Sequence, residues 1–276
     1  MTENRDFGKD GYRQQKQQER EEVFGMLDEA MEALSQPIGL KAYADVQSRL
    51  MSLSVSNALL VMKQRPDAKM LRTYDEWKEQ NISVKKGEKG VLALQGEEYT
   101  KEDGSAGRAS KVVRLFDISQ TNAEGREIRQ VAPGKFLREM TATSPVPVVL
   151  KDDLLKGTEG FYHETSGAIL LRENLPEASK VFVLARELSL IEIAGESGRS
   201  GQEAHAMAEL SAYLLTKRCG LEPPQLIFPR IMRSFEGKTA QEIRSDLSDA
   251  KRAASSIDYR CREYRKKQRE QSQEGR

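Results

Sequence analysis

A chain of 276 residues is long enough to bury two ordinary hydrophobic cores, so we expect two domains. Its 44 basic residues almost balance its 43 acidic residues, which excludes a globally basic protein and leaves only a local patch to bind nucleic acid. Two cysteines, two histidines and no apolar run near the ~20 residues of a membrane span predict a cytoplasmic protein with no disulfide framework, no cofactor and no membrane contact.

The first half of the chain combines helical periodicity with strand-like runs. Apolar residues after position 13 recur three and four apart until Pro37, which is typical of an amphipathic helix. The Lys-Lys-Gly-Glu-Lys-Gly stretch at 85–90 is a turn that leads into a strand. Helices are expected at 13–34, 40–63 and 74–80, strands at 91–94 and 111–116, and a hairpin loop at 101–110.

The second half predicts a small sheet and several helices. Residues 122–147 are rich in loop formers, including Pro133, Pro145 and Pro147, and indicate a domain boundary. After them we expect a strand at 147–150, a hairpin at 160–171, and helices at 178–194, at 202–218 and from Thr239 onward. The fold class is therefore α+β.

Residues 181–193 resemble the active-site helix of a zinc metallopeptidase without its metal ligands. In the pattern His-Glu-x-x-His, two imidazoles four residues apart bind one zinc ion and the Glu acts as general base. Arg186 and Leu190 stand at the two histidine positions, and only Glu187 remains. Because a guanidinium repels a cation and leucine has no lone pair, we expect neither zinc nor peptidase activity.

The last helix carries a narrow apolar seam over 243–264, with apolar residues alternately four and three apart. Such a seam needs a partner surface, so we expect either a protein partner or self-association through it. Its basic residues fit two alternatives, contact with a phosphate backbone or a charged end that only keeps the helix soluble. These residues are Arg260, Arg262, Arg265, Lys266, Lys267 and Arg269.

Several spaced blocks occur in the order found in one family. They are Ser56–Leu60, Gln64–Ala68, Trp77, Val84–Gly90 and Leu115–Thr121. Together they resemble the N-terminal domain of ArdC-type antirestriction proteins. The resemblance implies a domain that binds single-stranded DNA, followed by a zincin-like metallopeptidase domain. It also implies a role in antirestriction or DNA protection for a mobile element, such as a conjugative plasmid.

The resemblance extends into the second half of the chain. It implies that Glu187 corresponds to the general base and Glu209 to the third, carboxylate ligand. With both imidazoles missing, these carboxylates are vestigial, and we expect them to form an ion-pair cluster with Arg186 in place of the metal. His205 lies one turn before Glu209, so weak metal binding by the two is the alternative to an ordinary exposed histidine.

The DNA-binding residues follow from charge, aromaticity and the resemblance together. The turn 85–90 is basic and framed by glycines, so its backbone and lysines suit phosphate, although a solvated hairpin is the plainer alternative. Bases of a single strand stack on aromatic rings, for which Tyr74 and Tyr99 are better candidates than Trp77 and Phe116, which we expect in the core. The predicted DNA-binding set is Lys85, Lys86, Lys89, Arg65, Lys69, Tyr74, Tyr99 and Gln120.

The sequence thus predicts an ArdC-like DNA-binding domain at 13–130, a linker at 131–147, a degenerate zincin-like domain at 148–235, and a C-terminal helix with a basic tail at 238–276. Binding of single-stranded DNA by a protein with an inactive peptidase domain is the favoured function. A protein-interaction scaffold that uses the degenerate domain and the last helix is the second hypothesis, and an active zinc metallopeptidase is the third.

Overall fold

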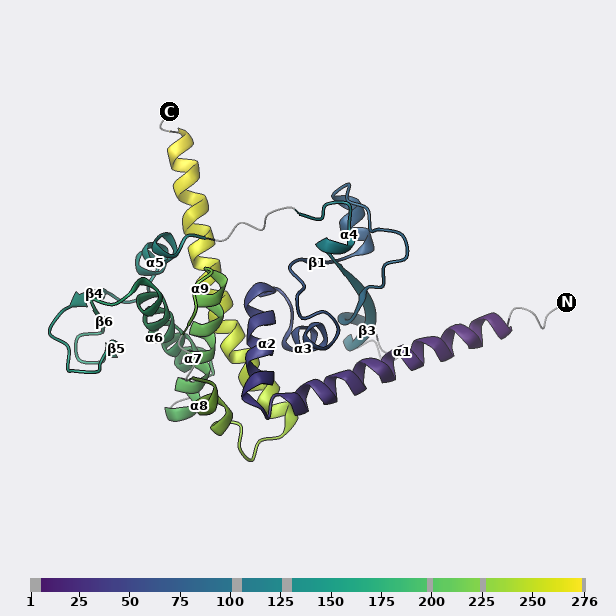
Figure 1. Ribbon diagram of the computed structural model, residues 1–276, viewed down its shortest axis with the longest axis horizontal. Coiled ribbons are helices and arrows are strands. Elements are labelled where there is room, and N and C mark those ends of the chain that lie inside the picture. Colours follow the sequence, from purple (N-terminus) through teal and green to yellow (C-terminus); the bar gives the residue numbers. More distant parts are fainter. Residues whose placement is uncertain (1–5, 101–105, 126–130, 198–200, 224–226, 275–276) are drawn as a thin grey trace. The chain divides into compact units, whose positions relative to one another are not determined.

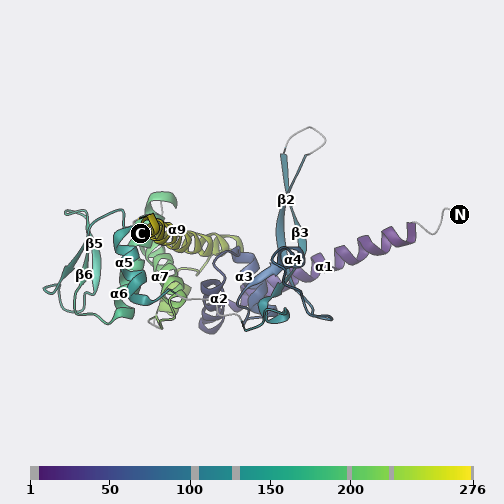
Figure 2. The same ribbon diagram turned by 90° about the horizontal axis from the view of Figure 1, so that it is seen from above.

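The computed structural model describes residues 6–100, 106–125, 131–197, 201–223 and 227–274 (Figures 1 and 2). The chain divides into two compact units. Unit 1 comprises residues 1–46 and 52–128, and unit 2 comprises residues 47–51 and 129–276. None of the helices in the described part of the chain is long and apolar enough to span a membrane.

In its described residues, unit 1 combines four α-helices with a three-stranded antiparallel sheet in the order β1-β3-β2. In the sheet, Thr73 and Val91 both align with Leu115 of the central strand. Figure 2 shows β2 and β3 as a long ribbon that projects from the helices. The elements are α1 (Asp6–Ala33), α2 (Pro37–Arg49), α3 (Val55–Gln64), β1 (Leu71–Thr73), α4 (Tyr74–Glu79), β2 (Val91–Thr100), β3 (Ala106–Asp117) and a 3-10 turn, η2 (Ile118–Gln120).

Helix α3 is attached to β2 by two amide side chains. The Gln64 amide donates to the carbonyl of Leu92 (2.9 Å) and accepts from its N–H (2.8 Å). Asn57 does the same at Leu94, at 2.9 and 2.8 Å. A strand edge needs partners for its backbone groups, and these side chains supply them where no further strand pairs.

The prediction of a single helix at 40–63 is wrong, because the helix is interrupted between α2 and α3. Ser54 begins α3 as its N-cap, with the Asn57 N–H donating to the Ser54 hydroxyl at 3.2 Å. Just before the break, the Gln47 side chain donates to the carbonyl of Leu50 at 3.1 Å. An apolar pattern that continues through both helices hides such a break, since only the side-chain caps reveal it.

The hairpin of unit 1 is longer than predicted. Its strands extend to Thr100 and from Ala106, well beyond the apolar cores at 91–94 and 111–116. Polar and small residues in the outer part conceal the strand pattern in the sequence, because they show no regular alternation with apolar residues. The predicted loop at 101–110 is therefore strand from Ala106 onward, and its residues 101–105 lie outside the described residues.

Unit 2 contains a second three-stranded sheet, in which the central β6 pairs in parallel with β4 and antiparallel with β5. Its core lies among the helices, where α6 and α7 pack together and α9 packs on both. The elements are α5 (Pro133–Ala142), β4 (Val148–Lys151), β5 (Gly160–His163), β6 (Ala168–Arg172), α6 (Glu177–Ser197), α7 (Gly201–Arg218), α8 (Phe228–Arg233) and α9 (Ala240–Glu274). The predicted α+β class is confirmed.

The linker predicted at 131–147 is interrupted by helix α5. Pro133 occupies the first turn of this helix, where its missing N–H costs no hydrogen bond. Phe136 and Met140 are buried, and α5 packs on α6 and α9. The proline that suggested a loop is therefore the start of a helix that belongs to unit 2.

The apolar seam of α9 faces its own unit. Leu247, Ala250, Ala254, Ile257 and Cys261 are each at most 1 % exposed, and α9 packs on α5, α6 and α7. The separate C-terminal helix predicted at 238–276 is thus an integral part of unit 2. The partner surface that the seam requires is supplied within the chain, which removes the reason to expect an external partner at 243–264.

Candidate functional sites

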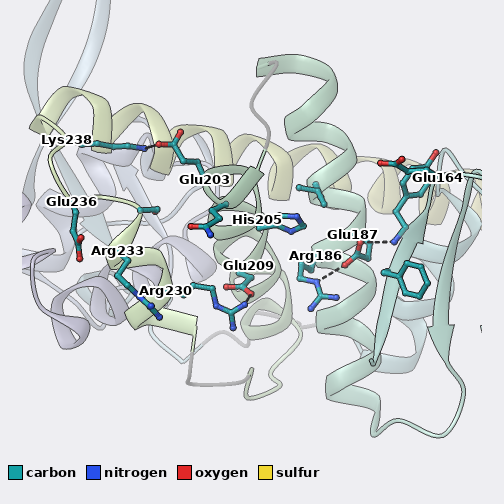
Figure 3. Close-up of a pocket in the computed structure, with 15 residues that line it drawn as sticks. Glu164, Arg186, Glu187, Glu203, His205, Glu209, Arg230, Arg233, Glu236 and Lys238 are labelled. Atoms are coloured by element: carbon teal, nitrogen blue, oxygen red, sulfur yellow. Dashed lines mark hydrogen bonds and ion pairs between the residues drawn. The ribbon is translucent and has the colours of Figure 1, made fainter. Parts of the chain in front are cut away.

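A cleft of about 940 Å³ lies in unit 2 beside the degenerate metallopeptidase helix, α6. Figure 3 shows side chains from α6, α7 and α8, with others from β5 and from the segment that follows α8, directed around it. The residues lining the cleft are Phe161, Tyr162, Glu164, Arg186, Glu187, Leu190, Gln202, Glu203, His205, Glu209, Arg230, Arg233, Ser234, Glu236 and Lys238. The cleft therefore gathers Arg186, Glu187, Leu190 and Glu209, as the sequence predicted.

Helix α6 presents its charged pair to the cleft and to the neighbouring edge strand, β5. The Arg186 Nε donates to Glu187 Oε1 at 2.7 Å, and its Nη2 donates to the carbonyl of Gly160 at 2.8 Å. The second Glu187 oxygen accepts the Tyr162 N–H at 3.0 Å. Glu187 is only 4 % exposed, and both its oxygens already have partners. In this arrangement Glu187 connects α6 to the edge strand β5.

Glu209, on α7, is buried beside the cleft and pairs with a residue that the sequence reasoning missed. Arg230 Nη1, from α8, lies 2.8 Å from Glu209 Oε1, whereas Glu209 Oε2 has no hydrogen-bond partner among the described residues. Burial raises the pKa of the Glu209 carboxyl, and the charges of Arg230, Arg186 and His205 oppose this rise. Of the expected ion-pair cluster, the structure forms the pair of Arg186 with Glu187, whereas Glu209 forms its ion pair with Arg230.

The donor set of the cleft does not fit a divalent metal. Among the described residues, no group of three His, Cys, Asp or Glu side chains is placed to hold one. Arg186 brings a fixed positive charge to the position of the first imidazole, and Leu190 brings no donor. His205 is exposed, and Glu209 already has Arg230 as a counter-ion, so these two residues alone fall short of the three ligands of a catalytic site.

In unit 1, the segment Asp117–Thr121 holds two basic loops together. The Asp117 carboxylate accepts the N–H groups of Lys69 (2.7 Å) and Met70 (2.9 Å) from the loop after α3. It also accepts the Ser119 hydroxyl at 2.7 Å. These bonds lower the pKa of the Asp117 carboxyl despite its desolvation by burial. The loop 65–70 is therefore fixed to the end of β3.

The same segment fixes the basic turn 85–90. The Gln120 amide donates to Glu88 Oε2 and to the carbonyl of Lys89, each at 2.8 Å, and the Lys85 N–H donates to the Gln120 carbonyl at 2.8 Å. Gly87 has a φ of 85°, which favours glycine, and a Cβ at Gly90 would lie 3.0 Å from the Leu115 carbonyl. Both glycines therefore have structural reasons to be there.

Ser119 is the point at which the two loops meet. Arg65 Nη1 donates to the Ser119 hydroxyl at 3.3 Å, and Lys85 Nζ donates to the Ser119 carbonyl at 3.1 Å. Lys85 also forms an ion pair with Glu124, which reduces its availability to another anion. Lys69, Lys86 and Lys89 are exposed, and no described carboxylate pairs with them. The structure thus brings together the two loops that carry the predicted basic residues of unit 1.

The remaining members of the predicted DNA-binding set differ in position. Tyr74 begins α4 and is 56 % exposed, so its ring is accessible. Tyr99 lies on β2, and its side chain lies outside the described residues. Gln120 is 1 % exposed and both ends of its amide are bonded, which favours a structural role.

Trp77 and Phe116 belong to the core of unit 1, as expected. Trp77 is 1 % exposed, its Nε1 donates to the carbonyl of Phe116 at 2.8 Å, and Phe116 packs against the same apolar cluster. Sequence reasoning missed Arg72, whose guanidinium lies 5.6 Å from the centre of the Trp77 ring. It also missed Arg230, because a six-residue helix that contains Pro229 is too short for a periodic signal.

Comparison with known proteins supports the resemblance read from the sequence. Residues 17–137 match the family model described as the N-terminal domain of anti-restriction factor ArdC. The fold is similar to two crystal structures of the antirestriction ArdC protein from the R388 plasmid. The Mn(II)-bound structure matches with a TM-score of 0.57 and 15% identity, over 85% of this chain and 97% of that one. The metal-free structure matches with a TM-score of 0.51 and 18% identity, over 75% of this chain and 85% of that one. No curated protein sequence matches this chain.

Proposed function

We propose that this chain, whose residues 17–137 match the family model of the ArdC N-terminal domain, binds single-stranded DNA through unit 1 and so contributes to antirestriction or DNA protection. The observation that carries the proposal is the meeting of two basic loops at Ser119. A mobile element that enters a cell as a single strand would be the natural beneficiary of such binding.

The two loops offer what a single strand requires. Phosphates are bound by clustered lysines and arginines with release of counterions, largely without regard to sequence. Lys69, Lys86 and Lys89 are exposed and can reach phosphates, and Arg65 is half-buried. Unpaired bases stack on exposed aromatic rings, and Tyr74 supplies one on the same unit. Because stacking needs an accessible base face, we expect single strands to bind more tightly than duplex DNA.

The test removes two exposed lysines from the basic turn of the full-length protein. Binding of a fluorescent single-stranded oligonucleotide is titrated at several salt concentrations for wild type and for Lys86→Ala/Lys89→Ala. If both lysines contact phosphate, the slope of log K against log salt should fall by about 1.4, since each contact to a single strand contributes about 0.7. Circular dichroism should show an unchanged fold.

A matched control removes two lysines of unit 1 that are already paired. Lys41 contacts Asp45 at 2.6 Å and Lys63 contacts Glu29 at 2.9 Å. The Lys41→Ala/Lys63→Ala variant loses the same formal charge, yet we expect its slope to stay near that of wild type. Equal losses in both variants would reduce the effect to net charge, and absence of binding to any single strand would refute the function.

For unit 2 we infer a peptidase-like fold that neither binds a catalytic metal nor cleaves peptides. The basis is the set of side chains at the metal-ligand positions. Arg186 replaces the first imidazole, and both oxygens of Glu187 already accept hydrogen bonds, one from Arg186 and one from the Tyr162 N–H. Metal analysis of the purified protein, after incubation with Zn(II) or Mn(II) and dialysis, should show far less than one ion per chain. One ion per chain that disappears in Glu209→Gln would overturn this inference.

A further inference from the structure

Unit 2 has a second concave surface, whose lining residues come from other segments of the sequence and other helices than those of the cleft. This groove, of about 700 Å³, runs between α5 and the C-terminal half of α9. The residues lining it are Lys135, Arg138, Glu139, Tyr264, Arg265, Gln268, Arg269, Ser272 and Gln273. Four of them are basic and one is acidic, so the lining carries an excess of three positive charges.

The one acidic side chain in the groove lining is already neutralised. Arg265 donates to both oxygens of Glu139, from Nε at 2.8 Å and from Nη2 at 2.6 Å. The two side chains are only 17% and 4% exposed, so the pair belongs to the floor and links α5 to α9. A planar two-point contact of this kind leaves Glu139 no free oxygen to repel an anion. Lys135, Arg138 and Arg269 remain at the rim, all exposed, with no described carboxylate in an ion pair with them.

The basic residues at 265–269 of α9 divide into those that line the groove and those that do not. Arg265, Arg269 and Ser272 line the groove, which is the spacing of three and four expected for one side of a helix. Lys266 and Lys267 are exposed on the same helical turn but do not line the groove. Sequence alone presents all of these cations as one basic tail, whereas the packing of α5 selects which of them share a concave surface.

We propose that this groove binds the phosphate backbone of a single-stranded nucleic acid, as a second contact surface in addition to the basic loops of unit 1. Cations from two helices suit a chain of phosphates better than one isolated anion, and the amides of Gln268 and Gln273 add hydrogen-bond donors. Among the described residues, the groove lining contains no aliphatic side chain that would insert into a membrane. That the bound chain is DNA rests on the proposed function of unit 1, whereas the preference for phosphates rests on the groove.

The test compares two double variants of the full-length protein that remove equal charge from the same region. Lys135→Gln/Arg269→Gln removes one cation from each wall of the groove, and Lys266→Gln/Lys267→Gln removes two that lie outside it. The probe is fluorescent poly(dT), titrated over a range of salt concentrations. The groove variant should bind roughly 25-fold more weakly at 0.1 M salt, with a slope reduced by about 1.4, because two phosphate contacts at about 0.7 each are lost. The control variant should remain within about two-fold of wild type by the same reasoning.

The outcomes separate this inference from the proposed function of unit 1. Equal losses in the two double variants would overturn the groove, because only net charge would then matter. Loss in Lys86→Ala/Lys89→Ala with none in the groove variant would overturn the groove and keep the function of unit 1. The reverse result would keep the groove and refute the basic turn. The last control measures binding of wild type and of the groove variant to vesicles that contain phosphatidylserine. If the groove variant loses vesicle binding but binds poly(dT) as wild type does, the groove binds a membrane surface and the inference is overturned.

Discussion

Restoring the two missing imidazoles tests whether the cleft of unit 2 retains the geometry of a metal site. Positions 186 and 190 both line the cleft and lie one turn apart on α6, and Glu209 lines it from α7. The Arg186→His/Leu190→His variant would therefore complete His-Glu-x-x-His around Glu187, with Glu209 as third ligand. We expect the double variant to take up zinc where wild type does not.

The magnitude follows from the contacts that the variant loses and gains. Arg186 makes two hydrogen bonds, to Glu187 and to the carbonyl of Gly160. Hydrogen bonds that involve a charged group are worth about 1.5 to 3 kcal/mol each, so without metal the variant should lose about 3 to 6 kcal/mol of unfolding free energy. Free zinc at 100 times its dissociation constant would return about 2.7 kcal/mol by linkage, which offsets roughly half of the loss or more.

Arg230 is the obstacle that the structure adds to this design. It lies 2.8 Å from Glu209 Oε1 and would compete with zinc for the carboxylate. A triple variant that adds Arg230→Met should therefore bind zinc more tightly than the double variant. Arg230→Met alone should bind none, because both imidazole positions remain vacant, and so it serves as the matched control.

The assay is thermal unfolding with and without zinc, together with the metal content after dialysis. Zinc should raise the midpoint of the double and triple variants and leave wild type and the control unchanged. A folded triple variant that retains no zinc would refute the reasoning, because Glu209 would then be misplaced as a ligand. Uptake that persists after Glu209→Gln would refute it as well, since the third ligand would lie elsewhere.

Three further predictions concern buried carboxylates. Arg265→Met should lower the free energy of unfolding, measured in urea, by about 3 kcal/mol, because it leaves the Glu139 charge buried and unpaired. Adding Glu139→Leu should restore most of this loss. A loss below about 1 kcal/mol for the single change would contradict the pairing. Burial raises the pKa of Glu209 in the folded state, so the stability that its protonated form contributes at low pH is lost as pH rises above 4.5 and the group ionises. Glu209→Gln should therefore make this fall in the free energy of unfolding less steep. Parallel curves of unfolding free energy against pH for the two proteins would argue against this. Asp117→Ala should lower stability by at least about 2 kcal/mol and weaken oligonucleotide binding, since it releases the loop 65–70 from β3; unchanged DNA binding in a folded variant would separate that loop from the site.

Local patterns in the sequence determined most of the elements and the state of the peptidase motif. The helices expected at 178–194 and 202–218 match α6 and α7 within a few residues, because the metallopeptidase-like pattern indicated the first and the glycine and prolines after residue 218 indicated the end of the second. The replacement of both imidazoles by Arg186 and Leu190 was legible without coordinates, since spacing of four on a helix directs both positions to one face. The ArdC-type blocks were recognisable as short motifs in a defined order.

Several of those blocks have meanings that only the tertiary structure decided. Asn57 and Gln64 complete the edge of β2, and Gln120 holds the basic turn from a buried position. A side chain of this type reads equally well as a ligand contact or as a structural brace, because its amide can bond to either.

Pairing and shared surfaces were likewise decided by the fold. Glu209 pairs with Arg230 rather than Arg186, and the cations of α9 form a groove only because α5 packs beside them. Both outcomes join residues far apart in the chain, and sequence spacing predicts neighbours only within a helix, a strand or a turn. Where charged groups from different elements meet is determined by how those elements pack, since packing alone decides which charges are removed from water together.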